Sequence, residues 1–290
     1  MSRPERWRPG AAGVTLAGEA DVTREDSVLT TDFVPGSPCW LDLGAPDPET
    51  TAAFYGAVLG WTFRPMGPEG SGYGVLQSEG RTVAGLGRLT EEGARSAWML
   101  YFATTDADAT ADAVTNAGGT VRVAPTGMDD EHRMAQFTDP QGGQFAVFEP
   151  RDDRGVEAVD VPGSLSWTEL YTPDGAAAKT FYTAVFGWQY SEMPLPGESG
   201  TYSLITPATA DESRMQGGLM QLPPDALTLT NGAAYWHPVF TTTDCDAATA
   251  TVTRNAGTVQ MGPETAEGVG RLSVCADPNG ADFVLLTPET

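Results

Sequence analysis

One 15-residue stretch occurs twice in the chain, and this repeat constrains the fold more than any other feature of the sequence. Asp47–Trp61 reads DPETTAAFYGAVLGW and Asp174–Trp188 reads DGAAAKTFYTAVFGW. Asp, Phe-Tyr, Ala-Val, Gly and Trp therefore recur at a constant separation of 127 positions. A single amphipathic helix of this kind is common, but two copies with the same aromatic pair and the same terminal glycine indicate a duplicated structural unit.

The repeated stretch predicts a helix between two strands. Asp47 is a good N-cap, because its carboxylate accepts hydrogen bonds from the free N–H groups of the first turn, and Pro48 suits the first helical position. Phe54 and Val58 place apolar side chains on one face at helical spacing. The glycine before each tryptophan ends the helix, since glycine adopts the left-handed conformation at little cost.

Strand patterns around this helix define a β-α-β-β-β unit, which the chain contains four times. A second, alanine-rich helix in each half begins at Asp106 or Asp244 and ends at a glycine. The predicted strands of the first half are 38–43, 61–66, 73–78, 81–89, 97–104, 121–124, 133–137 and 144–148. Those of the second half are 165–171, the strand opened by Trp188, 202–205, 215–221, 234–241, 271–275 and 281–286.

The two halves end in the same turn, which reads Asp-Pro-x-Gly at Asp139–Gly142 and at Asp277–Gly280. Proline and glycine at these positions favour a hairpin between the last two strands. A charged connector without hydrophobic periodicity separates the halves. The sequence therefore predicts an α+β protein with a flexible arm over 1–35, domains over 36–151 and 163–290, and a linker over 152–162.

Composition excludes several classes of partner. The 290 residues include 16 basic and 39 acidic side chains, and the formal charge of −23 argues against nucleic acid and anionic membranes. Three cysteines without a CxxC spacing fit a reducing compartment better than a disulfide framework. No apolar run reaches the length of a signal peptide core or a membrane span. We therefore expect a cytoplasmic protein, either a monomer or a homodimer.

These motifs resemble those of the vicinal oxygen chelate superfamily, which includes glyoxalase I, the bleomycin-resistance proteins and the extradiol dioxygenases. The shared signals are strand–Asp–x6–Phe-Tyr–x4–Gly-Trp, Asp–helix–Asn-Ala-Gly and the terminal Asp-Pro-x-Gly hairpin. They occur in both halves and cover roughly residues 36 to 288. The resemblance implies two tandem glyoxalase-like domains whose paired units form cup-shaped sheets around a small-molecule cavity.

In the superfamily's metal-using members, His, Gln or Glu binds the metal from four strands of each domain. The fourth strands of this chain, VAGLG and GGLMQ, offer no carboxylate or imidazole. At the other three positions the chain has Trp40, Met99 and Ala146 in the first half, and Trp167, His237 and Val284 in the second. Because a catalytic metal needs about three N, O or S ligands, we predict that neither domain holds the metal and that no cofactor is required.

Two pairs of residues stand where the metal ligands would be. Alternate residues of a strand share a face, so Trp40 and Asp42 point the same way, as do Trp167 and Glu169. An indole beside a carboxylate suits a flat ligand that is partly cationic or forms hydrogen bonds. The alternative is that the tryptophans fill the cups as core. The expected ligand-binding residues are Trp40, Trp98, Met99, Tyr101, Arg133, Trp167, Trp236 and Arg271.

Three functions remain open. The first is a metal-independent binding protein for a small aromatic compound, acting in sequestration, resistance or secondary metabolism. The second is a lyase, isomerase or tailoring enzyme that uses Glu169, His237 and Asp42 as acid or base; His237 is otherwise a relic metal ligand, a ligand donor or part of the cavity wall. The third is a metal-dependent lyase or dioxygenase with ligands drawn from Glu169, Glu264, Glu267 and His237.

Overall fold

The computed structural model describes residues 29–67, 72–90, 94–127, 133–149, 155–195 and 200–289. Residues 1–28 of the predicted arm and 152–154 of the predicted linker lie outside these ranges. Among the described residues, no helix is long and apolar enough to cross a membrane.

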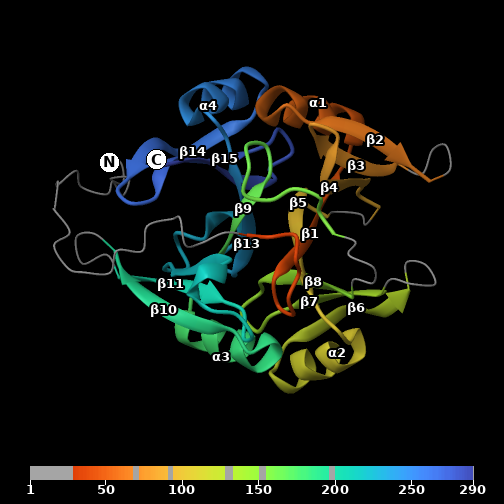
Figure 1. Ribbon diagram of the computed structural model, residues 1–290, viewed down its shortest axis with the longest axis vertical. Coiled ribbons are helices and arrows are strands. Elements are labelled where there is room, and N and C mark those ends of the chain that lie inside the picture. The colour runs from red at the N-terminus through yellow and green to blue at the C-terminus, as the bar shows by residue number, and fades with distance from the viewer. Residues whose placement is uncertain are drawn as a thin grey trace, which may run out of the picture.

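Each half of the chain forms one domain with two β-α-β-β-β units (Figure 1). The first contains β1 (Pro38–Ala45), α1 (Pro48–Leu59), β2 (Thr62–Met66), β3 (Tyr73–Ser78), β4 (Arg81–Arg88), β5 (Ala97–Ala103), α2 (Ala107–Asn116), β6 (Thr120–Gly127), β7 (Arg133–Thr138) and β8 (Gln144–Glu149). The second contains β9 (Leu165–Thr172), α3 (Gly175–Phe186), β10 (Gln189–Pro194), β11 (Thr201–Thr206), β12 (Gly217–Gln221), β13 (Tyr235–Thr241), α4 (Cys245–Arg254), β14 (Thr258–Ala266), β15 (Gly270–Ala276) and β16 (Asp282–Pro288).

The repeated helices begin and end where the sequence predicts. Asp47 accepts from the backbone N–H groups of the first turn of α1, and Asp174 does the same for α3. Gly60 and Gly187 close the two helices in the left-handed conformation, with φ of 74° and 70°. The same local chemistry therefore sets both helix boundaries.

Each domain contains one mixed eight-stranded sheet. The strand orders are β2-β3-β4-β1-β5-β8-β7-β6 and β10-β11-β12-β9-β13-β16-β15-β14, which are equivalent position by position. The first strands of the two units, β1 and β5, or β9 and β13, pair antiparallel at the centre of each sheet. Each sheet is curved, with its helices on the convex side (Figure 1). The predicted α+β architecture of four β-α-β-β-β units is confirmed.

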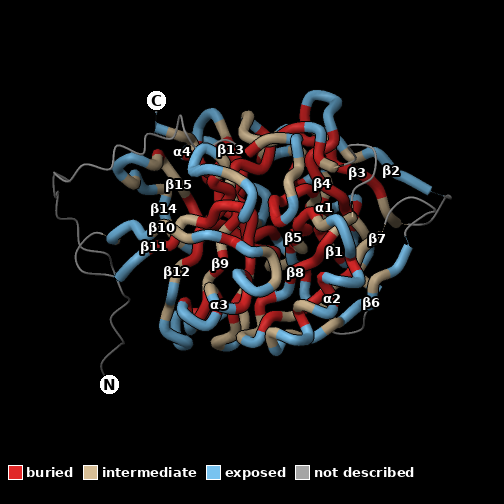
Figure 2. The backbone as a smooth tube through the Cα atoms, turned by 60° about the horizontal axis from the view of Figure 1, so that its bottom comes forward, coloured by how far each residue is buried: buried red, intermediate tan, exposed pale blue. Residues whose placement is uncertain are grey.

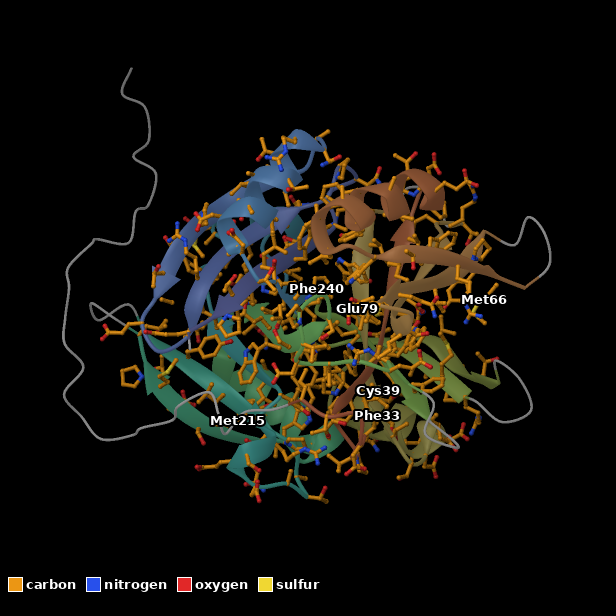
Figure 3. All side chains as sticks on the ribbon, turned by 45° about the horizontal axis from the view of Figure 1, so that its top comes forward. Phe33, Cys39, Met66, Glu79, Met215 and Phe240 are labelled. Carbon is orange, nitrogen blue, oxygen red and sulfur yellow. The ribbon has the colours of Figure 1, made fainter. Side chains whose placement is uncertain are left out.

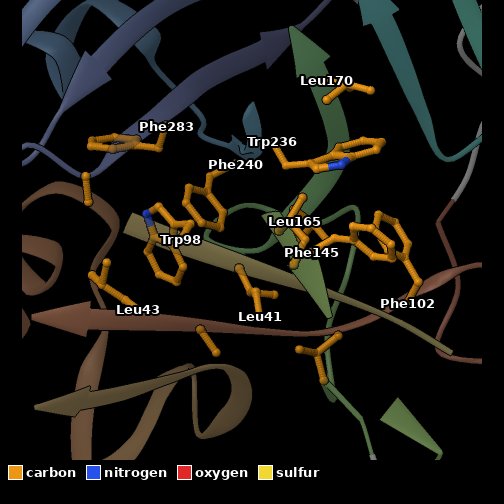
Figure 4. Packing of buried hydrophobic residues seen from close by; sticks show 14 of the residues in the cluster. Leu41, Leu43, Trp98, Phe102, Phe145, Leu165, Leu170, Trp236, Phe240 and Phe283 are labelled. Carbon is orange, nitrogen blue, oxygen red and sulfur yellow. The ribbon is translucent and has the colours of Figure 1, made fainter. Parts of the chain in front are cut away.

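One hydrophobic core runs through both domains. It includes Leu41 and Phe102 of the first domain, and Leu170 and Phe240 of the second, all with no exposed surface. Figure 4 shows these side chains packed together, and Figure 2 shows the buried backbone concentrated between the domains. In addition, α1 packs on α4 and α2 packs on α3, so helices as well as the core connect the two domains.

The repeated Gly-Trp and Phe-Tyr residues form reciprocal contacts across the domain boundary. Trp61 Nε1 donates to the carbonyl of Gly163 over 2.7 Å, and Trp188 Nε1 donates to the carbonyl of Gly36 over 2.9 Å. The hydroxyl of Tyr182 donates to Asp139 Oδ2 in the Asp-Pro-x-Gly turn of the first domain over 2.9 Å. The shared motifs thus join the domains as well as shaping each one.

Two regions differ from the sequence-based expectation. Part of the predicted arm is packed, because Leu29 is buried in the common core and Asp32 pairs with Arg214 of the second domain. Strand β14, which contains the Gly262-Pro263 pair, was not expected from the pattern. It is an edge strand, like β2, where Met66 is 43% exposed at the outer side of the molecule (Figure 3).

Candidate functional site

Half-buried polar and aromatic side chains occupy the concave face of each sheet. On β1, Leu41 is buried in the core, whereas its neighbours Trp40 and Asp42 point the other way and are only partly buried. Trp167 and Glu169 alternate with buried residues on β9 in the same way. We call the concave face around Asp42 cup 1, and the one around Glu169 cup 2.

In cup 1, aromatic donors surround the Asp42 carboxylate. Trp40 Nε1 and the Tyr73 hydroxyl each donate to Asp42 Oδ1 over 3.0 Å, and Tyr101 is also hydrogen-bonded to this carboxylate. Burial raises the pKa of Asp42, and the three hydrogen bonds offset only part of that effect. Asp42 therefore accepts a proton more readily than a solvated aspartate does.

In cup 2, three side chains hydrogen-bond the Glu169 carboxylate. The Tyr202 hydroxyl donates to Oε1 over 2.7 Å, while His237 Nε2 lies 2.9 Å and the Tyr171 hydroxyl 3.4 Å from Oε2. Trp167 Nε1 donates to the Tyr202 hydroxyl over 2.8 Å. The indole thus reaches Glu169 through a tyrosine, whereas the indole of cup 1 contacts its carboxylate directly.

His237 lies between two carboxylates. Its Nδ1 is 2.6 Å from Asp282 Oδ2, and its side chain has no exposed surface. Burial alone would lower the pKa of His237, but the hydrogen bonds and charges of Asp282 and Glu169 outweigh it and raise the pKa to about 9. Burial would likewise raise the pKa of Glu169, but His237 and the two tyrosines lower it overall. At neutral pH the cluster contains an imidazolium between two carboxylates.

Sequence reasoning missed Asp282, Tyr73 and Tyr202. Asp282 is two residues before Val284, which occupies the expected ligand position on the last strand, and alternate strand residues share a face. That parity was the available signal for Asp282. The tyrosines lie on β3 and β11, whose register against the carboxylate strands the sequence pattern does not fix.

Two of the predicted ligand-binding residues face the core instead of the cups. Trp98 and Trp236 are each 5% exposed and lie in the core shared by the domains (Figure 4). Trp98 Nε1 donates to the Tyr55 hydroxyl, and Trp236 Nε1 donates to the Tyr182 hydroxyl. Because Met99 immediately follows Trp98 on its strand, the two side chains must point to opposite faces of the sheet.

The two predicted arginines also point away from the cups. Arg133 pairs with Asp108 of α2, and Arg271 pairs with Asp246 of α4, each with a shortest N–O distance of 2.5 Å. Both helices cover the convex side of their sheets. Arg133 and Arg271, which the sequence predicts as ligand-binding residues, therefore lie away from the cups.

Other predicted residues do lie on the concave side. Met99 and Tyr101 pack with Trp40 and Ala146 in a small cluster separate from the main core. In the second domain, Val239 occupies the equivalent place beside Trp167. The tryptophans are thus partly packed, and they keep half-exposed surfaces in both cups.

The donors in the cups do not fit the metal that the family resemblance implies. In cup 1 the expected ligand positions hold Trp40, Met99 and Ala146, none of which provides a carboxylate or an imidazole. In cup 2, Glu169 and Asp282 bind the two different nitrogens of His237, on opposite sides of the ring, so the three groups do not converge on one point. Within the described part of the chain, no three His, Cys, Asp or Glu side chains are arranged to hold a metal ion.

Glycine on the fourth strand contributes to this mismatch. Gly85 of β4 pairs with Asp42, and Gly218 of β12 pairs with Glu169. A Cβ on Gly85 would overlap Asp42 Oδ1, and one on Gly218 would overlap the Tyr202 hydroxyl. The carboxylate and its tyrosine therefore occupy the space that a ligand side chain from the fourth strand would need.

A surface cavity of about 360 Å³ lies outside both cups. It is formed where the end of α1 meets the start of the second domain, and its lining includes Val58, Ser78, Glu79, Gly163 and Thr242. Glu79 is the single titratable side chain in this lining. This cavity therefore lacks the buried carboxylate with aromatic hydrogen-bond donors that each cup contains.

Comparison with known proteins links this architecture to one superfamily. Residues 40–148 match the family model described as a glyoxalase-like domain, and residues 164–285 match that of the glyoxalase/bleomycin resistance protein/dioxygenase superfamily. Among solved structures, the 2,3-dioxygenase LapB from Pseudomonas sp. KL28 aligns with a TM-score of 0.59 at 16% identity, covering 88% of this chain and 94% of that one. The Mn(II)-bound glyoxalase from Novosphingobium aromaticivorans aligns with a TM-score of 0.57 at 18% identity, covering 88% and 85%.

Relatives of higher sequence identity appear among known proteins. The anthracycline biosynthesis protein DauV from Streptomyces sp. (strain C5) is 34% identical over 270 residues, which cover 87% of this chain and 94% of DauV. The putative glyoxylase CFP32 from Mycobacterium bovis is 30% identical over 262 residues, covering 89% and 97%. Both matches extend across the two domains, and the chain therefore belongs to the vicinal oxygen chelate superfamily as a tandem two-domain member.

Proposed function

We propose that the protein binds a flat aromatic small molecule in its cups without a resident metal. The observation that carries this proposal is the half-buried tryptophan beside a hydrogen-bonded carboxylate in each cup. The indole face offers a stacking surface, while the carboxylate accepts hydrogen bonds from the ligand. The relationship to an anthracycline biosynthesis protein supports a fused-ring aromatic ligand handled in secondary metabolism.

The test is a titration with a soluble fused-ring anthraquinone, followed by tryptophan fluorescence and native mass spectrometry. Trp40→Leu and Trp167→Leu should each weaken binding in their own cup by about five- to thirtyfold, the loss expected from one aromatic contact. Arg133→Ala is the control, because Arg133 pairs with α2 on the convex side. If no fused-ring compound binds the unmodified protein, or if both tryptophan variants bind like the control, the proposal is wrong.

A second candidate is acid-base catalysis in cup 2. It is favoured by the chain of hydrogen bonds from Asp282 through His237 to Glu169, which reaches the concave face only at Glu169. Buried carboxylate–imidazole arrays of this kind can move protons. Turnover of a 2-oxoaldehyde such as methylglyoxal that is abolished in Glu169→Gln would favour an enzyme. If both proteins show only the background rate, binding remains as the one proposed function.

A further inference from the structure

The two cups differ at two equivalent positions. Where cup 2 has His237 and Asp282, cup 1 has Met99 and Gln144. His237 and Met99 lie on β13 and β5, the strands that open the second unit of each domain. Asp282 and Gln144 lie on β16 and β8, the last strand of each domain along the chain. Cup 1 therefore contains one carboxylate with a raised pKa, whereas cup 2 contains two carboxylates and an imidazolium.

The described side chains of the cup 2 cluster carry one more negative charge than positive charge. Among the described residues, the ion pairs of Glu169 and Asp282 are both with His237, so one positive charge faces two negative ones. His237 has no exposed surface and Asp282 has 5%, but the side chain of Glu169 is 17% exposed. Because an uncompensated charge is costly to bury, a cation placed beside Glu169 would be strongly favoured.

The neighbours of Glu169 suit a cation. Tyr171 and Tyr202 donate their hydroxyls to the carboxylate, and the Tyr171 and Tyr235 rings pack against the His237 ring with centroids 4.5 and 5.6 Å away. Oε1 accepts one hydrogen bond and has a further lone pair for a ligand N–H. Electron-rich rings around a carboxylate are a recurring environment for ammonium groups.

A further positive charge near the tyrosines of cup 2 is that of Arg95. It acts on Tyr235 and lowers the pKa of that residue in part, but burial dominates and raises the Tyr235 pKa overall. Arg95 Nη1 points to the carbonyl of Gly280, in the turn before β16. Its guanidinium therefore does not occupy the place beside Glu169.

We propose that cup 2 binds the ammonium group of an aromatic amine, with Glu169 as its counter-ion. Cup 1 has no such preference for an aromatic amine over an uncharged aromatic compound. This inference rests on the proposed function, since it names the ligand class and the cup used. The aromatic part of the ligand lies against Trp167 and the apolar cluster of Val239, Val274 and Val284. The ammonium group neutralises the charge that Asp282 adds to the cluster.

The test compares two probes that share a ring system, 2-naphthylmethylamine and 2-naphthalenemethanol, by calorimetry at physiological salt. The amine should bind the unmodified protein at least about tenfold more tightly than the alcohol, the difference expected for a partly desolvated ion pair with aromatic neighbours. Glu169→Gln should remove this preference, because it should weaken binding of the amine by a larger factor than binding of the alcohol. Asp42→Asn is the matched control, because it replaces the corresponding carboxylate of cup 1 and should keep the preference.

Asp282→Asn provides a second variant in case Glu169→Gln fails to fold. It leaves Glu169 in place and removes the uncompensated charge, so it should also reduce the preference for the amine. Equal binding of amine and alcohol by the unmodified protein would overturn the inference and leave the proposed function intact. A preference that is lost in Asp42→Asn but kept in Glu169→Gln would place the cation in cup 1 and also overturn it. Failure of both probes and of the fused-ring compounds would refute the proposed function itself.

Discussion

The protonation of His237 makes a quantitative prediction about stability. Its pKa of about 9 in the folded protein lies roughly 2.5 units above its ordinary value of 6.5, and each unit corresponds to about 1.4 kcal/mol. The side chain is fully buried, so solvent does not screen this interaction. Protonation of His237 in its folded environment should therefore contribute about 3 kcal/mol to the free energy of unfolding while His237 is charged in the folded state.

The sign of the pH dependence follows from the direction of the shift. The folded state binds the His237 proton more tightly than the unfolded state, so the contribution is complete below pH 6.5 and is lost as pH rises to about 9. Between these values the free energy of unfolding should fall by about 1.4 kcal/mol per pH unit. Glu169 has a lowered pKa and is already ionised throughout this range, so it adds no opposing slope.

The assay is urea denaturation of the unmodified protein and of His237→Gln between pH 7 and 9. The difference between their free energies of unfolding isolates the His237 contribution, because His132 and the buried cysteines are common to both proteins. We expect this difference to shrink with rising pH. A difference that stays constant from pH 7 to 9, or an NMR titration of the imidazole with a midpoint near 6.5, would show that the ion-paired cluster does not exist as described.

Three further predictions concern the domain boundary, the glycines and the metal. Tyr182→Phe removes the hydroxyl that bonds Asp139 and Trp236, and should lower the free energy of unfolding by about 1–3 kcal/mol in denaturation experiments. Gly218→Ala should displace Tyr202 from the carboxylate, lowering stability by about 1–3 kcal/mol and weakening aromatic-ligand binding in calorimetry. Metal analysis of protein purified without chelators should give less than one equivalent, and EDTA should leave the melting temperature unchanged; stoichiometric metal or a lowered Tm would show that the donor geometry has been misjudged.

The architecture could be predicted because its signals are local and duplicated. Asp47 and Gly60 fix the ends of α1 through backbone hydrogen bonds and a left-handed residue, and the second copy confirms the reading. Strand β14 was missed because its Gly262-Pro263 pair looks like a turn, and an edge strand tolerates such residues where a central strand does not. Packing of Leu29 onto the core depends on distant residues that no local pattern reveals.

The candidate site could be predicted only where strand parity applies. Trp40, Asp42 and Glu169 lie on the concave face, where strand parity places them, since the helix cap fixes their position along the strand. Trp98 and Met99 were both assigned to the cup, but adjacent residues of a strand point to opposite faces. Trp98 therefore could have been excluded from the sequence alone. Arg133 was misplaced because its orientation depends on an ion pair with Asp108, 25 residues earlier in the chain.

The reciprocal contacts at the domain boundary have a consequence for how the two cups can change. Trp61 and Trp188 each donate a hydrogen bond to a backbone carbonyl of the other domain, so the two domains pack together as the subunits of a symmetric dimer would. In a homodimer, every substitution appears in both binding sites at once. Here one continuous chain contains both cups, so the same structural position can be His237 in cup 2 and Met99 in cup 1. Covalent linkage has freed the two sites to specialise separately on a shared scaffold.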